Sequence, residues 1–125
     1  MAEVIIGIGT DIAEIKRIRK AAENPRFLQE YFSEAERVFL AGKRDAAPSV
    51  ANNFAAKEAF SKALGTGVRG FALSEVTILR DTLGAPVLTL SGRAAEIAAQ
   101  RGVTAMHVSL SNTDEYAVAF VVLEG

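Results

Sequence analysis

Three charged side chains have the types and spacing that a phosphorylated ligand requires. Glu58 and Lys62 stand four residues apart in the alanine-rich stretch NFAAKEAFSKALGTG, so they share one face of a helix. Asp11 follows the apolar segment VIIGIGT near the start of the chain. Two carboxylates brought together suit Mg²⁺, which usually takes one or two of them and completes its shell with water and substrate phosphates. The sequence therefore predicts a magnesium site in which Lys62 neutralises phosphate oxygens.

These positions also have structural interpretations that the sequence leaves open. Thr10 or Asp11 could cap a helix, with the glutamate a few residues further on reaching back. Lys57, Glu58 and Lys62 could form the solvated face of a helix that buries aromatic side chains on its other side. A dinucleotide-binding loop is disfavoured, because GIGTDI has isoleucine in place of the third glycine and no βαβ run follows it.

Gly65, Thr66 and Gly67 end the helix that carries Glu58 and Lys62. Two glycines allow a backbone to approach a ligand closely, and Thr66 adds a hydroxyl. The dipole of a helix C-terminus does not favour phosphate, so a phosphate here would depend on Lys62 or on a metal.

The first half of the chain is predicted to be mainly helical after one strand. Residues 3–9 are β-branched and apolar, which predicts a buried strand. A helix is expected from Asp11, because Ile12, Ile15 and Ile18 recur at three-residue spacing. The other helical segments expected are residues 27–32, residues 33–40 behind a Ser33–Glu36 capping box, and residues 49–64, with breaks at Asn24-Pro25 and residues 42–48.

The second half predicts two antiparallel hairpins separated by one helix. The expected elements are strands at residues 74–80 and 86–90, a helix from Ser91 through Ala99, and strands at residues 106–111 and 115–123. The last strand, YAVAFVVL, is apolar on both faces, which predicts burial on both sides and favours a subunit interface. Helices gathered early and hairpins late predict an α+β fold.

Length and composition limit the classes of protein. A chain of 125 residues with 50% hydrophobic and 23% charged residues is expected to form one domain over residues 1–125. A net charge of −1 argues against a nucleic-acid binder that works through overall charge. The lack of cysteine excludes disulfides and thiolate sites, and a single histidine disfavours multi-histidine zinc. The start, MAEVIIGIG, lacks the basic region of a secretory signal and no stretch has the length of a membrane span, so no membrane contact and a cytoplasmic location are expected.

Residues 16–26 carry five basic side chains and one acidic, a local excess of +4 in a chain of net −1. Such runs are usually solvated helix faces, but this one could also dock an acidic partner. Arg26 is followed by Phe27, which would add an apolar anchor to the charges.

The single histidine is the last candidate for chemistry. Alternation in MHVSLS places His107 on one strand face with Ser109 and Ser111. A lone histidine among serines is typical of a hydrogen-bonded structural residue, so His107 is left out of the predicted catalytic set.

Three blocks of the sequence together resemble one family, the holo-acyl-carrier-protein synthases, which are small phosphopantetheinyl transferases. The blocks are GIGTDIAEIKRI, FAAKEAFSKALGTG and HVSLSNTDEYAVA, in the family's order and at suitable spacing, and the middle block is the most specific. The similarity covers nearly the whole chain. It implies a compact α+β fold and transfer of 4′-phosphopantetheine from coenzyme A to a serine of apo acyl carrier protein, with release of 3′,5′-ADP. It also implies Mg²⁺ and a homotrimer with active sites between subunits.

The resemblance further implies roles for individual residues. By position, Asp11 and Glu58 would be metal ligands and Lys62 would contact the coenzyme A phosphates. The residues that would lie along the nucleotide are Ser61, Gly65, Thr66, Gly67, Asn112 and Thr113. Those that would face the carrier protein, whose recognition helix is acidic in this family, are Arg17, Arg26 and Phe27. A metal and a lysine suit a reaction that builds negative charge on phosphoryl oxygens. The identity of the general base is left open between Glu58 and a metal-bound water.

Two positions depart from the family pattern. Many members have an arginine where this chain has Asn53 and a histidine where it has Asn112. Asparagine keeps a hydrogen bond but loses the positive charge. We therefore expect weaker coenzyme A binding, which Asn53→Arg and Asn112→His would strengthen.

Two other functions compete with the transferase. A degenerate family member could use the basic helix only to bind an acidic protein; the two asparagines support it, whereas the intact Asp11, Glu58 and Lys62 argue against it. A different pyrophosphate-processing enzyme could carry a similar Mg²⁺ site. The basic helix beside that site favours a protein substrate instead.

Overall fold

The computed structural model describes residues 4–125, so Glu3, the first residue of the expected strand, lies outside the described range. In chain order the elements are β1 (Ile5–Glu14), α1 (Ile15–Ala21), α2 (Pro25–Tyr31), α3 (Glu34–Ala41), α4 (Ala47–Leu64), the 3₁₀ helix η1 (Leu73–Glu75), β2 (Val76–Arg80), β3 (Pro86–Leu90), α5 (Gly92–Gln100), β4 (Ala105–Asn112) and β5 (Tyr116–Glu124).

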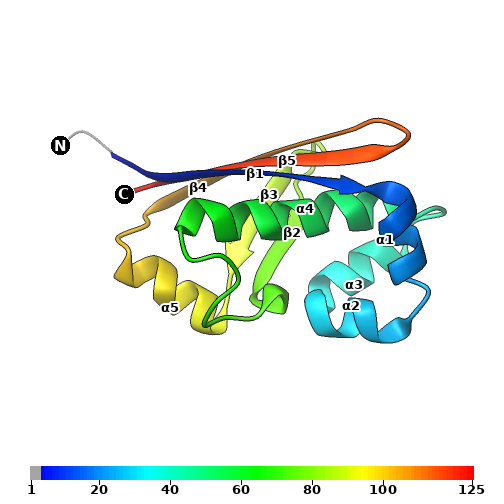
Figure 1. Ribbon diagram of the computed structural model, residues 1–125, viewed down its shortest axis with the longest axis horizontal. Helices are drawn as coiled ribbons and strands as arrows, with labels where there is room; N and C mark the ends of the chain where they lie inside the picture. The colour runs from blue at the N-terminus through cyan, green and yellow to red at the C-terminus, as the bar shows by residue number, and fades with distance from the viewer. Residues whose placement is uncertain (1–3) are drawn as a thin grey trace.

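Helices pack on one face of a three-stranded antiparallel sheet. β5 is the central strand, with β1 on one side and β4 on the other, and β2 and β3 form a separate two-stranded hairpin. α4 runs beneath β1 and β5, with α1, α2 and α3 near one of its ends and α5 near the other (Figure 1). This combination of helices and antiparallel strands confirms the expected α+β fold.

β1 is longer than expected, and the first helix starts later. Antiparallel pairing with β5 continues to Glu14, opposite Tyr116, so α1 begins only at Ile15. The residue at the N-cap of α1 is Glu14, which makes no side-chain capping bond. The expected helix from Asp11 is therefore wrong, and neither Thr10 nor Asp11 is a helix cap.

The spacing of three isoleucines explains that error. Ile12 lies in β1 opposite Val118 and is 62% exposed on the outer side of the sheet. Ile15 and Ile18 belong to α1 and are buried. The three-residue spacing therefore includes one strand residue and two helix residues. The pairing of β1 with β5 decides the structure at Ile12, although the spacing is typical of a helix.

The long helix α4 and both hairpins are confirmed. α4 ends at Leu64, and Gly65 caps it in the left-handed region, with φ of 84°. The Ser33–Glu36 capping box at the start of α3 is also present. α4 is buried on nearly all sides because alanines let neighbouring elements approach it. Within residues 4–125, no helix has both the length and the apolar character that crossing a membrane requires.

The outer side of the three-stranded sheet is apolar and uncovered. Alternate residues of β5 face α4 and are fully buried, whereas Val118 and Phe120 are 37% and 44% exposed. Ile8 and Ile12 of β1 lie beside them, and we call these four residues the outer sheet face. Within one chain, β5 is therefore buried only on the side that faces α4, and the predicted burial on both sides is not found. On the same side, His107 contacts the carboxylate of Glu124, as expected of a hydrogen-bonded structural histidine.

Candidate active site

Asp11 and Lys62 meet where β1 crosses α4. The Lys62 ammonium lies 3.0 Å from Asp11 Oδ1 and donates a second hydrogen bond, also 3.0 Å, to the carbonyl oxygen of Thr10. The Lys62 side chain is 55% exposed, whereas that of Asp11 is 19% exposed. The lysine is therefore accessible to a ligand from solvent, while the Thr10 carbonyl and the Asp11 carboxylate hold its ammonium in place.

Two glycines bring β1 close enough for this contact. A Cβ on Gly9 would lie 1.9 Å from the carbonyl oxygen of Ala59, and one on Gly7 would lie 1.8 Å from that of Ala63. Any side chain there would push the strand off the helix. The glycines of GIGTDI thus pack a strand against a helix, which agrees with the rejection of a dinucleotide-binding loop.

Glu58 lies close enough to Asp11 for the two charges to interact. Burial raises the pKa of the Glu58 carboxyl, the negative charge of Asp11 raises it further, and the positive charge of Lys62 partly opposes both. A second cation placed between the two carboxylates would relieve this repulsion.

The donor set fits a magnesium ion better than a transition metal. Asp11 and Glu58 offer hard carboxylate oxygens, and in residues 4–125 no group of three or more histidine, aspartate or glutamate side chains gathers. Mg²⁺ needs only one or two carboxylates, since water and substrate phosphates complete its shell. The pair therefore suits Mg²⁺ and leaves open positions for a phosphorylated substrate.

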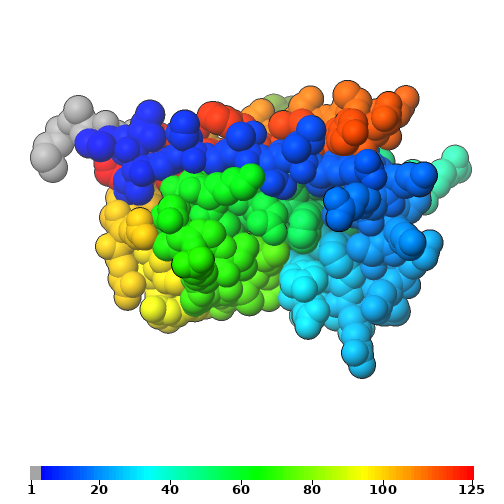
Figure 2. Space-filling view, viewed as in Figure 1, coloured from blue at the N-terminus to red at the C-terminus, as the bar shows by residue number. Residues whose placement is uncertain are grey.

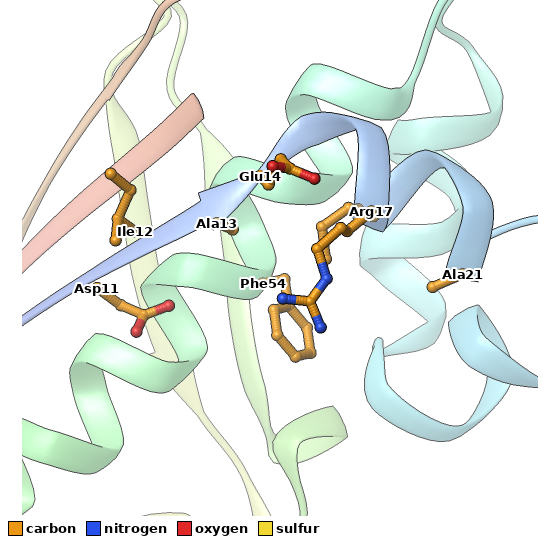
Figure 3. A pocket seen from close by; sticks show the side chains of 8 residues that line it. Asp11, Ile12, Ala13, Glu14, Arg17, Ala21 and Phe54 are labelled. Carbon is orange, nitrogen blue, oxygen red and sulfur yellow. The ribbon is translucent and has the colours of Figure 1, made fainter. Parts of the chain in front are cut away.

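A cavity of about 310 Å³ lies beside Asp11 at the junction of β1 and α1. Its lining residues are Asp11, Ile12, Ala13, Glu14, Arg17, Ile18, Ala21 and Phe54. Figure 3 shows the carboxylate of Asp11 and the guanidinium of Arg17 on the same side of this junction, near the Phe54 ring. The cavity joins Asp11 to the basic helix α1, and the sequence did not single out Phe54 as part of it.

Phe27 belongs to an aromatic cluster rather than standing alone. Its ring centroid lies 5.5 Å from that of Tyr31 and 5.7 Å from those of Phe32 and Phe54. Arg26, its neighbour in the sequence, is exposed at the start of α2. This half-buried ring connects the surface beside Arg26 to the cavity that Phe54 lines.

Lys57 is not part of the solvated face of α4. Its side chain is fully buried, contacts Glu36, and donates to the carbonyl oxygens of Leu73 and Val76. Burial lowers the pKa of Lys57, and the charge of Glu36 opposes that shift. One residue along a helix turns a side chain by about 100°, so Lys57 anchors α4 to α3 and β2 while Glu58 faces the site.

Asn53 belongs to the same internal network, which bears on one expectation. Its side chain is fully buried, donates 3.0 Å hydrogen bonds to Glu36 and to the carbonyl oxygen of Ile78, and accepts one of 2.9 Å from Arg80. An arginine at this position would meet packed protein rather than a ligand. The burial of Asn53 therefore argues against the gain in coenzyme A binding expected from Asn53→Arg.

The residues expected along the nucleotide from α4 divide into two sets. Ser61 is buried, and its hydroxyl donates to the carbonyl oxygen of Lys57, so its side chain is not presented to a ligand. Gly65, Thr66 and Gly67 begin a surface loop that runs to Gly70, called the Gly65 loop below, and both glycines have positive φ. Only this loop leaves its backbone accessible.

Asn112 and Thr113 lie at the opposite end of the sheet from that loop. They begin the β4–β5 turn, which enters β5 where Tyr116 pairs with Glu14, whereas the Gly65 loop follows Ala63 beneath Gly7. The seven residue-to-residue steps from Gly7 to Glu14 span roughly 23 Å at the rise of a β-strand. One chain therefore cannot place both segments on one nucleotide (Figure 1).

Comparison with known proteins shows the family. The model of the 4′-phosphopantetheinyl transferase superfamily matches residues 7–121, and the chain belongs to this superfamily. The chain is 42% identical over 121 residues to the holo-[acyl-carrier-protein] synthase of Caldanaerobacter subterraneus, covering 96% of this chain and 95% of that protein. It is 44% identical over 124 residues to the synthase of Vibrio cholerae, covering 97% and 98%.

Solved structures of such synthases have the same fold. That of Neisseria meningitidis superposes with a TM-score of 0.92 at 32% identity, covering 98% of this chain and all of that chain. That of Bacillus anthracis, in complex with CoA (3′,5′-ADP), gives a TM-score of 0.83 at 36% identity and covers 99% of both chains.

Proposed function

We propose that the chain transfers 4′-phosphopantetheine from coenzyme A to a serine of an apo acyl carrier protein and releases 3′,5′-ADP, as one transferase domain over residues 1–125. The observation that carries this proposal is the meeting of Asp11, Glu58 and Lys62 at the crossing of β1 and α4, in a chain of the phosphopantetheinyl transferase superfamily. Relatives that share more than 40% of its residues are named holo-[acyl-carrier-protein] synthases.

In this reaction the chain would bind and orient the pyrophosphate of coenzyme A. Lys62 would stabilise the negative charge that builds on phosphoryl oxygens, because its ammonium is exposed and held by Asp11 and Thr10. Glu58 is the candidate base among the chain's own residues, since its raised pKa suits it to accept a proton. The serine nucleophile belongs to the carrier protein.

Asp11 and Glu58 would hold Mg²⁺. Bound Mg²⁺ would act as a Lewis acid toward the pyrophosphate. The fit rests on the two hard carboxylates. Burial and then the negative charge of Asp11 raise the pKa of Glu58, and a bound cation would relieve the repulsion between the two carboxylates.

The carrier protein would dock on α1 and the start of α2. Arg17 lines the cavity beside Asp11, and Arg26 and Phe27 lie further along the same basic segment. An acidic helix there would bring its serine toward Asp11, because the cavity connects Asp11 to Arg17. The cytoplasmic location expected from the sequence stays a prediction.

A homotrimer would complete the site. The outer sheet face offers Ile8, Ile12, Val118 and Phe120 for burial against other copies. The Gly65 loop and the Asn112 turn lie at opposite ends of one sheet, so a shared nucleotide requires one segment from each of two subunits. Both observations support active sites between subunits.

Intact mass spectrometry of the carrier protein tests the transferase directly. The purified chain is incubated with coenzyme A, Mg²⁺ and an apo acyl carrier protein. We expect the carrier to gain one phosphopantetheine, a gain lost with EDTA or with Glu58→Gln but kept with Glu34→Gln, an exposed glutamate on α3. No gain with several carrier proteins would contradict the proposal.

The same assay separates the competing functions. Coenzyme A binding without transfer would indicate a degenerate binder, whose support is weaker now that Asn53 is known to lie inside the protein. Turnover of coenzyme A without a carrier protein would indicate a different pyrophosphate-processing enzyme.

A further inference from the structure

Arg101 lies beside the Gly65 loop, although the two are far apart in the sequence. Arg101 caps the C-terminal end of α5, and its Nη1 is 3.6 Å from the point where a Cβ on Gly65 would stand. A Cβ on Gly70, at the other end of this loop, would lie 3.5 Å from Ile97 of the same helix. Figures 1 and 2 show α5 (yellow) against the segment that follows α4 (green). The contact of α5 with the loop therefore places a guanidinium at its surface.

The guanidinium of Arg101 has no acceptor in the part of the chain that the structure describes. Arg19, Arg80 and Arg93 each donate to a carboxylate or an amide, whereas Arg101 is exposed and makes no side-chain hydrogen bond or ion pair there. An arginine with five free donors beside an open backbone loop suits a phosphate group, which it can bind with two parallel hydrogen bonds.

The segment of chain that contains the loop carries only positive charge. Lys62 precedes it by one helical turn, Arg69 lies near its end, and no acidic residue occurs from residue 59 through residue 74. Arg69 and Arg101, like the loop backbone, are exposed. The field at the loop therefore favours an anion even though the C-terminal dipole of α4 does not.

Lys62 and Arg101 lie in different places around the loop, so they would bind two different anionic groups of one ligand. Lys62 is bound to Asp11 on the side of the carboxylates, which is where the proposed function puts the pyrophosphate. Arg101 stands on the other side of the Gly65 loop, against α5. Coenzyme A carries a second anion, the 3′-phosphate of its ribose, at the end remote from the reacting group.

We propose that Arg101 binds the 3′-phosphate of coenzyme A and makes the site select coenzyme A over dephospho-coenzyme A. This inference rests on the proposed function for the identity of the ligand. Gly65 has no side chain to separate the guanidinium from a nucleotide lying on the loop. Arg101 takes no part in the chemical step, so its effect falls on binding and KM, with kcat nearly unchanged.

Binding of two substrates that differ by one phosphate tests the assignment. Calorimetry with coenzyme A and with dephospho-coenzyme A is compared for the wild type, Arg101→Gln, Arg101→Lys and the control Arg93→Gln on the same helix. We expect Arg101→Gln to raise the Kd for coenzyme A about tenfold and to leave that for dephospho-coenzyme A unchanged. Arg101→Lys should recover part of the loss, and Arg93→Gln should match the wild type.

Three results would overturn the assignment. They are equal weakening of both ligands by Arg101→Gln, no weakening of either, and a wild type that does not bind coenzyme A. Because calorimetry needs no carrier protein, a wild type that binds coenzyme A but transfers nothing would overturn the proposed function alone. In that case, selective loss in Arg101→Gln would still support the role of Arg101.

Discussion

Gly9 lies against the carbonyl oxygen of Ala59 so closely that a methyl group at Gly9 would come within 1.9 Å of it. Gly9→Ala should therefore separate β1 from α4 and cost more than about 3 kcal/mol of unfolding free energy. Gly42→Ala is the matched control, because its Cβ would meet nothing nearer than 3.6 Å and its φ is −79°. Urea unfolding measures the unfolding free energy of both variants. Equal values for Gly9→Ala and Gly42→Ala would contradict the close approach of β1 to α4.

The two lysines of α4 should separate stability from activity. Lys57→Met leaves Glu36 charged and buried, so it should lower the unfolding free energy by about 3–5 kcal/mol. Lys62→Met removes a largely exposed ammonium, so the fold should keep its stability while transferase activity falls about 10²–10³-fold. Thermal unfolding and the mass assay of the carrier protein are run on both variants. A Lys57→Met variant as stable as the wild type would contradict the predicted loss of stability.

The pKa of Glu58 should respond to its two neighbours with opposite signs. Asp11→Asn removes a negative charge and should lower the pKa of Glu58, whereas Lys62→Met removes a positive charge and should raise it. NMR titration of the Glu58 side-chain carboxyl in metal-free protein measures both shifts. Shifts of the same sign would show that burial changes, rather than charge, dominate.

The raised pKa also predicts how metal-free stability depends on pH. A carboxyl whose folded pKa exceeds its unfolded value stabilises the fold fully below the unfolded pKa and loses that stabilisation as pH rises through the folded pKa. Glu58→Gln should thus unfold at a higher temperature than the wild type in EDTA at neutral pH, with the gap closing toward about pH 4. Saturating Mg²⁺ should reverse the order, since only the wild type binds it well. An unchanged gap across this pH range would contradict the prediction.

Assembly should depend on the outer sheet face and not on exposed apolar residues in general. Phe120→Glu places a charge at the centre of that face and should give a monomer. Leu83→Glu is the control, because Leu83 is 94% exposed at the tip of the β2–β3 hairpin. Native mass spectrometry distinguishes the states; a trimeric Phe120→Glu would exclude this face as the interface.

Sequence patterns predict correctly those features that depend on a few neighbouring residues. They fail for features that depend on contacts between segments far apart in the sequence. The capping box at Ser33 and the glycine stop at Gly65 depend on a few neighbouring residues, and both are present. The local pattern predicts a helix at Ile12, because the pairing of Ile12 with Val118 of β5 cannot be inferred from neighbouring residues.

The candidate site shows the same limit. Glu58 and Lys62 share a helix face by their spacing alone, and their meeting with Asp11 agrees with the sequence prediction. Lys57, Ser61 and Asn53 turn inward because α3 and β2 cover that side of α4, which no spacing rule reveals. Arg101 reaches the Gly65 loop only through the docking of α5.

The separation of the Gly65 loop from the Asn112 turn has a genetic consequence in the proposed trimer. Each catalytic centre would draw on two copies of the chain, so a subunit defective in one segment would disable only the centre to which it contributes that segment. Two alleles with defects in different segments could therefore restore each other partially, because some centres of a mixed trimer would receive an intact copy of both segments. At low concentrations of the chain, activity in a cell would rise more than proportionally with that concentration, because a single subunit holds no complete centre.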